Sequence, residues 1–176
     1  EYLRGFQHRR SAFFVTGDVD GILPLPSFCR TAGFECIDGS VALRDLGHSR
    51  LAFLGLGAGQ ALDEAVLSRL VRESEGAAVR ILLSHHPDAL FMARSGPIQL
   101  HLAGHTHGGQ VCLPWLGPLV TLSRVSRGIA AGGLHRVGNL QVLVSRGMGW
   151  EGHIAPRVRL FCRPHLLLVE LVPGHG

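Results

Sequence analysis

Short apolar runs of strand length, separated by glycine-rich stretches, are the feature that most limits the folds open to this chain of 176 residues. Such a rhythm is typical of a sheet-forming protein. The runs cover residues 12–15, 51–54, 80–83, 98–102, 141–144 and 166–171. A helical pattern interrupts them in the middle of the chain, whereas the later runs follow one another without a clear helix between them. We therefore predict an α/β fold with a mixed sheet, antiparallel towards the C-terminus.

The helical pattern covers residues 61–73, where Leu62, Val66, Leu70 and Val71 recur at the spacing of one helix face. A shorter helix is expected after Pro26. Residues 41–54 predict a β-hairpin, because polar and glycine turn residues at 45–49 separate two strand-like arms. The chain has the length of one ordinary domain, no internal repeat and no long linker, so we expect residues 1–176 to form a single domain.

All 17 basic residues are arginines, and seven of them lie in the C-terminal third. A guanidinium group binds phosphate through two hydrogen bonds, so these residues favour anionic partners. The other interpretation is that they are solvated side chains, because the net charge of +4 is modest. Aromatic residues make up only 6% of the chain, too few for a base-stacking surface, and we expect no nucleic-acid partner.

The chain contains no run of about 18 apolar residues, so we expect it neither to cross a membrane nor to carry an export signal. Its four cysteines form no C-x-x-C pair and lie among apolar residues. They are expected to be buried thiols, not disulfides or zinc ligands.

Histidines are concentrated in one part of the sequence, with five of the eleven between positions 85 and 107. His85 and His86 follow one predicted strand directly, and His105 and His107 follow the next. A spacing of two residues lets the imidazoles of His105 and His107 project to one side of an extended segment. Because neutral imidazole is a common ligand for zinc, manganese and iron, we predict a metal site built on His85, His105 and His107. His86 and His101 are interpreted as structural.

These segments carry a resemblance to a known family. The sequence Gly-His-Thr-His-Gly-Gly-Gln at 104–110 resembles the G-H-x-H motif of the calcineurin-like metallophosphoesterases, in the extended form of a bacterial subgroup that is often membrane-linked. The segment 81–88 is similar to the one that supplies the family's isolated metal histidine. Segments 113–118, 133–135 and 144–147 resemble the tail of the same subgroup. The chain is therefore identified as the C-terminal half of this family's α/β/β/α sandwich.

The resemblance implies a role for each of four residues. His85 and His105 would bind one ion, and His107 would bind its neighbour, since the family normally holds two divalent transition-metal ions, Mn, Zn or Fe. The sequence Gly-Asp-Val-Asp at 17–20 stands where the family usually has G-N-H-D. Asp18 would then replace the asparagine ligand of the second ion.

The sequence also departs from the family pattern. Val19 occupies the place of a histidine that assists the family's transition state, and a valine can neither donate nor accept a proton. The family's earlier motifs, D-x-H and G-D-x-x-D, do not occur in the chain. These motifs supply most ligands of one ion, so the chain is either part of a longer protein or a degenerate relative.

The function implied is metal-dependent hydrolysis of phosphoric esters, by a chain that we expect to be weakly active on its own. The alternative is a degenerate or truncated metal-binding module without catalytic activity. We expect the substrate to be a phosphorylated small molecule or a lipid headgroup, with peripheral membrane contact, and the protein to be cytoplasmic or membrane-associated. Two further hypotheses have little support: a dinucleotide-binding loop at 55–59, whose third glycine is one place early, and a serine hydrolase at Ser145.

Overall fold

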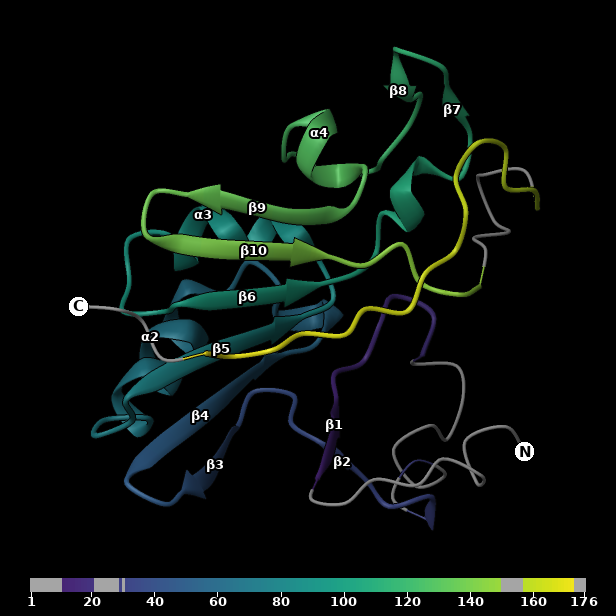
Figure 1. Cartoon of the computed structure of the whole chain (residues 1–176). Helices are drawn as coiled ribbons and strands as arrows, with labels where there is room; N and C mark the ends of the chain where they lie inside the picture. Colours follow the sequence, from purple (N-terminus) through teal and green to yellow (C-terminus); the bar gives the residue numbers. More distant parts are fainter. Residues whose placement is uncertain (1–10, 21–28, 30, 150–156, 173–176) are drawn as a thin grey trace.

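A six-stranded mixed sheet forms the centre of the molecule (Figure 1). The computed structural model describes residues 11–20, 29, 31–149 and 157–172. The strand order is β3–β4–β5–β6–β10–β9. Its strands are β3 (Val41–Leu46), β4 (Ser49–Leu56), β5 (Val79–Ser84), β6 (Leu100–Ala103), β9 (Gly133–Val137) and β10 (Leu140–Val144). The prediction of an α/β fold with a mixed sheet is confirmed.

The four central strands β4, β5, β6 and β10 run parallel, and an antiparallel strand closes each edge of the sheet. The outer strand β3 is joined to β4 by a tight turn at Gly47 and His48, which confirms the predicted hairpin. The expected antiparallel pairing towards the C-terminus is also present, since β9 pairs antiparallel with β10. The carboxyl ends of all four parallel strands therefore meet at one edge of the sheet, where ligand sites of α/β proteins form.

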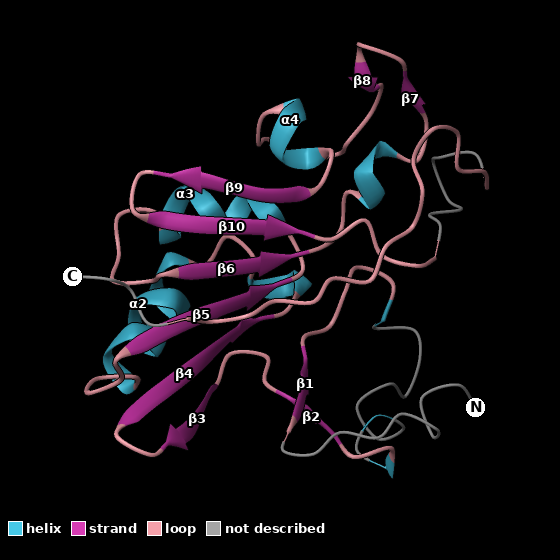
Figure 2. Ribbon diagram, viewed as in Figure 1, coloured by secondary structure: helices cyan, strands magenta, loops and turns pink. Residues whose placement is uncertain are grey.

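Helices cover one face of this sheet, as Figure 2 shows. The helix α2 (Glu64–Glu73) begins after Asp63, whose carboxylate accepts a hydrogen bond from the backbone N–H of Val66. Its buried residues are Leu67 and Leu70. The predicted helix is thus correct, but it starts later than expected, and Leu62 is exposed outside it. The short helix α3 (Leu90–Ala93) follows a 3-10 turn (Pro87–Ala89) and packs into the same core.

The other face of the sheet is crossed by the C-terminal segment, drawn in yellow in Figure 1. The prediction of a strand at 166–171 is wrong, because these residues join no ladder. Leu167 packs against a small apolar cluster of Ile81, Leu100 and Leu143, while Leu166 is exposed. The segment therefore has the alternation of a strand but lies across the sheet instead of along its edge.

Two small two-stranded sheets lie outside the central one. The parallel pair is β1 (Ala12–Phe14) with β2 (Phe34–Cys36), and the antiparallel pair is β7 (Cys112–Leu113) with β8 (Gly117–Pro118). A last short helix, α4 (Arg127–Ala130), precedes β9. Most of the helix expected after Pro26 lies outside the described residues.

Two further expectations have a structural outcome. None of the four cysteines forms a disulfide in the described part of the chain, as expected, although Cys36 and Cys112 are only partly buried. Within the same residues, no helix has the length and apolar character needed to cross a membrane.

Candidate metal centre

A group of four metal-binding side chains gathers at the carboxyl edge of the sheet: Asp18, His85, His86 and His105. The Asp18 carboxylate lies at its centre, with one oxygen 2.9 Å from Nε2 of His86 and the other 2.9 Å from Nδ1 of His105 and 3.2 Å from Nε2 of His85. Nε2 of His85 and Nδ1 of His105 are 3.3 Å apart. Three of the four predicted ligands, Asp18, His85 and His105, are therefore brought together.

Asp18 reaches the histidines because its loop approaches them closely. Gly17 has no side chain, and a Cβ atom there would lie 2.9 Å from the ring of His85. The loop is tethered on its other side by Asp38, whose carboxylate accepts hydrogen bonds from the backbone N–H and the hydroxyl of Thr16. A side chain at position 17 would therefore push the His85 ring away, and glycine leaves this ring in place beside Asp18.

His85 and His86 are held by a buried polar chain beneath them. The Ser84 hydroxyl donates to the carbonyl oxygen of His86 at 2.7 Å, and Nε2 of the fully buried His101 lies 2.6 Å from the same hydroxyl. Burial lowers the pKa of His101 to about 4, so this ring is neutral. Its position within the sheet agrees with the structural role expected for it.

His105 occupies a strained turn that follows β6. Its φ of 65° lies in the left-handed region, which a residue with a side chain rarely adopts. Its Nε2 lies 3.1 Å from the carbonyl oxygen of Leu122, so that Nδ1 is the nitrogen that faces Asp18. The neighbouring Thr106 anchors the turn by donating its hydroxyl hydrogen to the carbonyl oxygen of Ala130. Strain that the surroundings maintain in this way is common at functional sites.

His107 lies outside the cluster of four ligand atoms. Its Nδ1 is 3.3 Å from the guanidinium group of Arg159, which also donates to the carbonyl oxygens of His107 and Arg146. Arg159 therefore fastens the C-terminal segment to the turn that bears His105 and His107. In this arrangement the two histidines of the G-H-T-H sequence have different neighbours.

The structure also places His86, which the sequence pattern indicates as structural, in the group. Its ring packs at an incline of 45° against that of His105, with centroids 3.9 Å apart, and its side chain is as accessible as that of His85. Successive residues of a strand point to opposite faces, but β5 ends at Ser84, so this rule does not apply to His85 and His86. Pro87, directly after the two histidines, indicates in the sequence that the extended backbone ends there.

The electrostatics of the cluster suit a cation. Burial of the Asp18 carboxylate opposes its ionisation, but the hydrogen bond from His86 and the charges of the three histidines outweigh this effect and lower the pKa of Asp18. Burial, the largest cause, lowers the pKa of His85. The carboxylate is thus anionic and the His85 ring neutral, the forms in which both side chains bind metals.

The spacing of the ligand atoms also fits a metal ion. Nitrogen and oxygen ligands about 2.1 Å from a tetrahedral ion lie roughly 3.4 Å from one another. The contacts around Asp18 measure 2.9 to 3.3 Å, and one ligand atom from each of the four residues lies within 4.8 Å of all the others. A set of imidazoles with one carboxylate is suited to zinc, manganese or iron.

A cavity of about 840 Å³ adjoins the cluster at His86. Asp88 fixes one wall by accepting hydrogen bonds from the Ser123 hydroxyl and the backbone N–H of Arg124, and Leu122 also lines it. The segment 58–64 forms the opposite wall. The hypothesis of a dinucleotide-binding loop at 55–59 does not fit this arrangement, because Gly55 lies within β4 and α2 begins only at Glu64.

Comparisons with known proteins show similarity to bacterial hydrolases of phosphoric esters and pyrophosphates. No family model matches the chain. The metallophosphoesterase YkuE of Bacillus subtilis is 38% identical over 49% of this chain and 28% of its own length. The phosphodiesterase YaeI of Escherichia coli is 36% identical over 56% of this chain and 34% of its length. The UDP-2,3-diacylglucosamine pyrophosphatase LpxG of Chlamydia muridarum is 31% identical over 51% of this chain and 28% of its length.

A solved structure shares the fold. A Staphylococcus aureus protein named as a 5′-nucleotidase superposes with a TM-score of 0.52 and 13% identity, over 78% of this chain and 33% of that protein. The chain spans about a third of the length of the curated relatives described above, which fits the prediction of a C-terminal half. The names of these relatives are those of phosphoester- and pyrophosphate-cleaving hydrolases. These similarities confirm the resemblance of the chain to the calcineurin-like metallophosphoesterase superfamily.

Proposed function

We propose that the chain binds a divalent transition-metal ion through Asp18, His85, His86 and His105 and takes part in the hydrolysis of phosphoric esters. The observation that carries this proposal is the convergence of these four side chains, from three separate stretches of sequence, around one carboxylate. His107 is proposed as a ligand of a second, neighbouring ion. The other ligands of that ion belong to motifs that this sequence lacks.

A bound divalent ion lowers the pKa of a coordinated water molecule and stabilises negative charge on phosphoryl oxygens. The chain's own residues prepare the site for this chemistry. Asp18 supplies the negative charge that attracts the ion, and burial keeps His85 neutral. The Asp18 side chain is 44% exposed, so one side of the cluster is open to water and substrate.

The substrate is proposed to be a phosphorylated small molecule or a lipid headgroup. The cavity beside His86 has room for the organic part of such a molecule, and the Arg124 side chain on its rim supplies a positive charge. Two of the relatives are named for the cleavage of a phosphodiester and of a lipid-linked pyrophosphate.

A second candidate is a metal-binding module without catalytic activity. The observation that favours it is Val19, which lies beside Asp18 and is 49% exposed. A side chain at this position faces solvent next to the cluster, but valine cannot deliver a proton to a leaving group. The two candidates share the metal site and differ only in turnover.

The first experiment is elemental analysis of transition metals per folded monomer, for the chain and for the double variant His105→Ala/His107→Ala, with His48→Ala as a control on an exposed turn. About one ion per chain, lost only in the double variant, would support the site. Hydrolysis of bis(4-nitrophenyl) phosphate with added manganese then separates the enzyme from the inactive module. A folded chain that binds no metal contradicts the proposal.

A further inference from the structure

The β7–β8 hairpin carries an exposed apolar surface, which we call the apolar tip. It consists of Leu113, Trp115, Leu116, Leu119 and Val120 on the hairpin, with Leu160 and Phe161 beside its base. Trp115 is fully exposed, and Phe161 is 70% exposed. Figure 1 shows the hairpin projecting from the body of the molecule. Exposed apolar groups that are gathered in this way mark interaction sites more often than scattered ones do.

The apolar tip joins two stretches of chain that are far apart in sequence. The backbone N–H of Cys112 donates to the carbonyl oxygen of Leu160, and the N–H of Leu160 donates to that of Gln110. Across the hairpin, the N–H of Leu119 donates to the carbonyl oxygen of Val111. The exposed side chains are thus presented on a backbone whose hydrogen bonds are made locally, so the tip is a defined projection.

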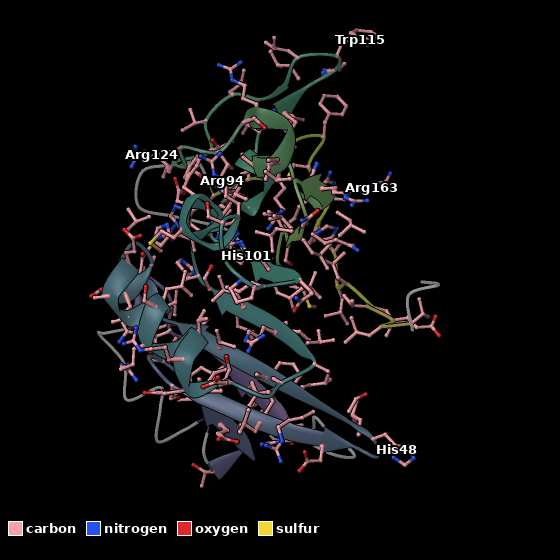
Figure 3. All side chains as sticks on the ribbon, turned by 90° about the vertical axis from the view of Figure 1, so that its left-hand side faces the viewer. His48, Arg94, His101, Trp115, Arg124 and Arg163 are labelled. Atoms are coloured by element: carbon pink, nitrogen blue, oxygen red, sulfur yellow. The ribbon has the colours of Figure 1, made fainter. Side chains whose placement is uncertain are left out.

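The part of the sequence that carries the hairpin is basic. Residues 89–150 contain five arginines and no aspartate or glutamate, and residues 151–176 add three arginines and two glutamates. By contrast, eleven of the thirteen acidic residues lie in the first 88 positions. Figure 3 shows Trp115 at the end of the molecule, with Arg124 and Arg163 below it on opposite sides. An apolar projection among cations, without acidic residues in the same segment, is complementary to an anionic lipid surface.

We propose that the apolar tip docks the chain onto an anionic membrane, with Trp115 and Leu116 inserted at the interface and the surrounding arginines against lipid phosphates. A tryptophan ring is suited to the headgroup level, where one end meets apolar chains and the other meets water. Apolar insertion combined with basic side chains is the usual pairing in surface-bound proteins. The proposal rests on the proposed function and favours a lipid headgroup as its substrate, because a docked chain would meet phosphorylated headgroups near its metal cluster.

The test is flotation of the chain with vesicles of phosphatidylcholine alone or mixed with an equal amount of phosphatidylglycerol, in the presence of EDTA. We expect binding to the anionic vesicles only, weakened by salt. Trp115→Ser should reduce the partition coefficient about tenfold, since burial of one large apolar side chain contributes at least ~1.4 kcal/mol. Leu46→Ser, at an exposed apolar position on the remote β3–β4 hairpin, should have no effect.

A second pair of variants tests the charge. Arg124→Gln/Arg127→Gln should weaken binding to anionic vesicles, whereas Arg72→Gln on α2 should not. In a Trp150→Phe background, where Trp115 is the only tryptophan, its fluorescence should shift to the blue on binding.

Two results would overturn the proposal. One is equal binding by the Trp115→Ser and Leu46→Ser variants, or no preference for anionic lipid. The other is a lipid-free dimer, detected by light scattering, that Trp115→Ser dissociates, because the tip would then be an interface between two copies. Neither readout depends on metal or turnover, so a failure here is distinguishable from a failure of the proposed function.

Discussion

At the scale of single residues, the candidate metal centre depends on how many ligands surround Asp18. Its carboxylate has His86 on one oxygen and His85 and His105 on the other. If all three imidazoles bind one ion, His86 is a full ligand, not a neighbour of His85. The Ser84 hydroxyl donates to the backbone carbonyl oxygen of His86 and so fixes the backbone from which this imidazole projects.

We therefore predict that His86→Ala weakens the affinity for zinc or manganese by roughly tenfold or more, since even residues that merely orient ligands contribute factors of ten to a hundred. Competition with a chromophoric chelator measures the change. His48→Ala, which removes an exposed histidine far from the site, is the control. Unchanged affinity in the His86→Ala variant would remove His86 from the ligand set and leave Asp18, His85 and His105.

At the scale of elements, the centre depends on how the β1–β2 pair is fitted against β4, because the loop after β1 carries Asp18. The backbone of Ile37, just beyond β2, crosses β4 at Gly55 and leaves no room for a side chain there. A Cβ atom on Gly55 would lie 2.0 Å from the carbonyl oxygen of Ile37. A Cβ atom added to Gly59, a few residues further on, would have no other atom within 4 Å.

This difference gives a matched pair of substitutions. Gly55→Ala should destabilise the chain by about 3 kcal/mol or more, because the neighbouring atom belongs to the backbone and cannot rotate away. Gly59→Ala should change stability by less than about 0.5 kcal/mol. Urea unfolding followed by circular dichroism measures both. Similar midpoints for the two variants would show that the β2 segment does not pack on β4 in this way.

Helices and strands were predicted correctly where only one kind of structure could produce the sequence pattern. The apolar runs at β4, β5 and β10 and the hairpin at β3–β4 were predicted because buried parallel strands and tight turns have strict sequence requirements. The run at 166–171 looks the same in sequence but lies across the sheet, since no unpaired central strand remained for it. Periodicity indicates which face of a segment is apolar, but not whether its backbone pairs.

The sequence predicted part of the site. Asp18, His85 and His105 come together because each follows a strand that ends at the same side of the fold, and the family resemblance identified them. Two features were not predictable. The place of His86 depends on the backbone turn at Pro87, and the contact of His107 with Arg159 depends on a segment more than 50 residues away.

At the scale of the whole molecule, the proposed ion would connect the small β1–β2 sheet to the six-stranded sheet. Asp18 belongs to the loop after the small β1–β2 sheet, whereas the three histidines belong to the edge of the six-stranded sheet. The two regions are also joined by the hydrogen bond from the N–H of Ala58 to the carbonyl oxygen of Thr16, by the Arg44–Glu35 ion pair and by the ring contact of Phe13 with Phe53. An ion bound by both regions therefore stabilises the folded state as a whole.

We predict that removal of the ion lowers the midpoint of thermal unfolding. At a free ion concentration one hundred times the Kd, binding stabilises the folded chain by about 2.7 kcal/mol, which corresponds to roughly 5–10 °C for a chain of this size. Scanning calorimetry with added manganese or zinc and with EDTA measures the difference. Asp18→Ala should abolish most of it, because that variant keeps all the histidines but breaks the link to the β1–β2 sheet. If the midpoint of Asp18→Ala still rises with metal as much as that of the parent chain, the ion binds only at the edge of the central sheet, and the two sheets are held together by their direct contacts without it.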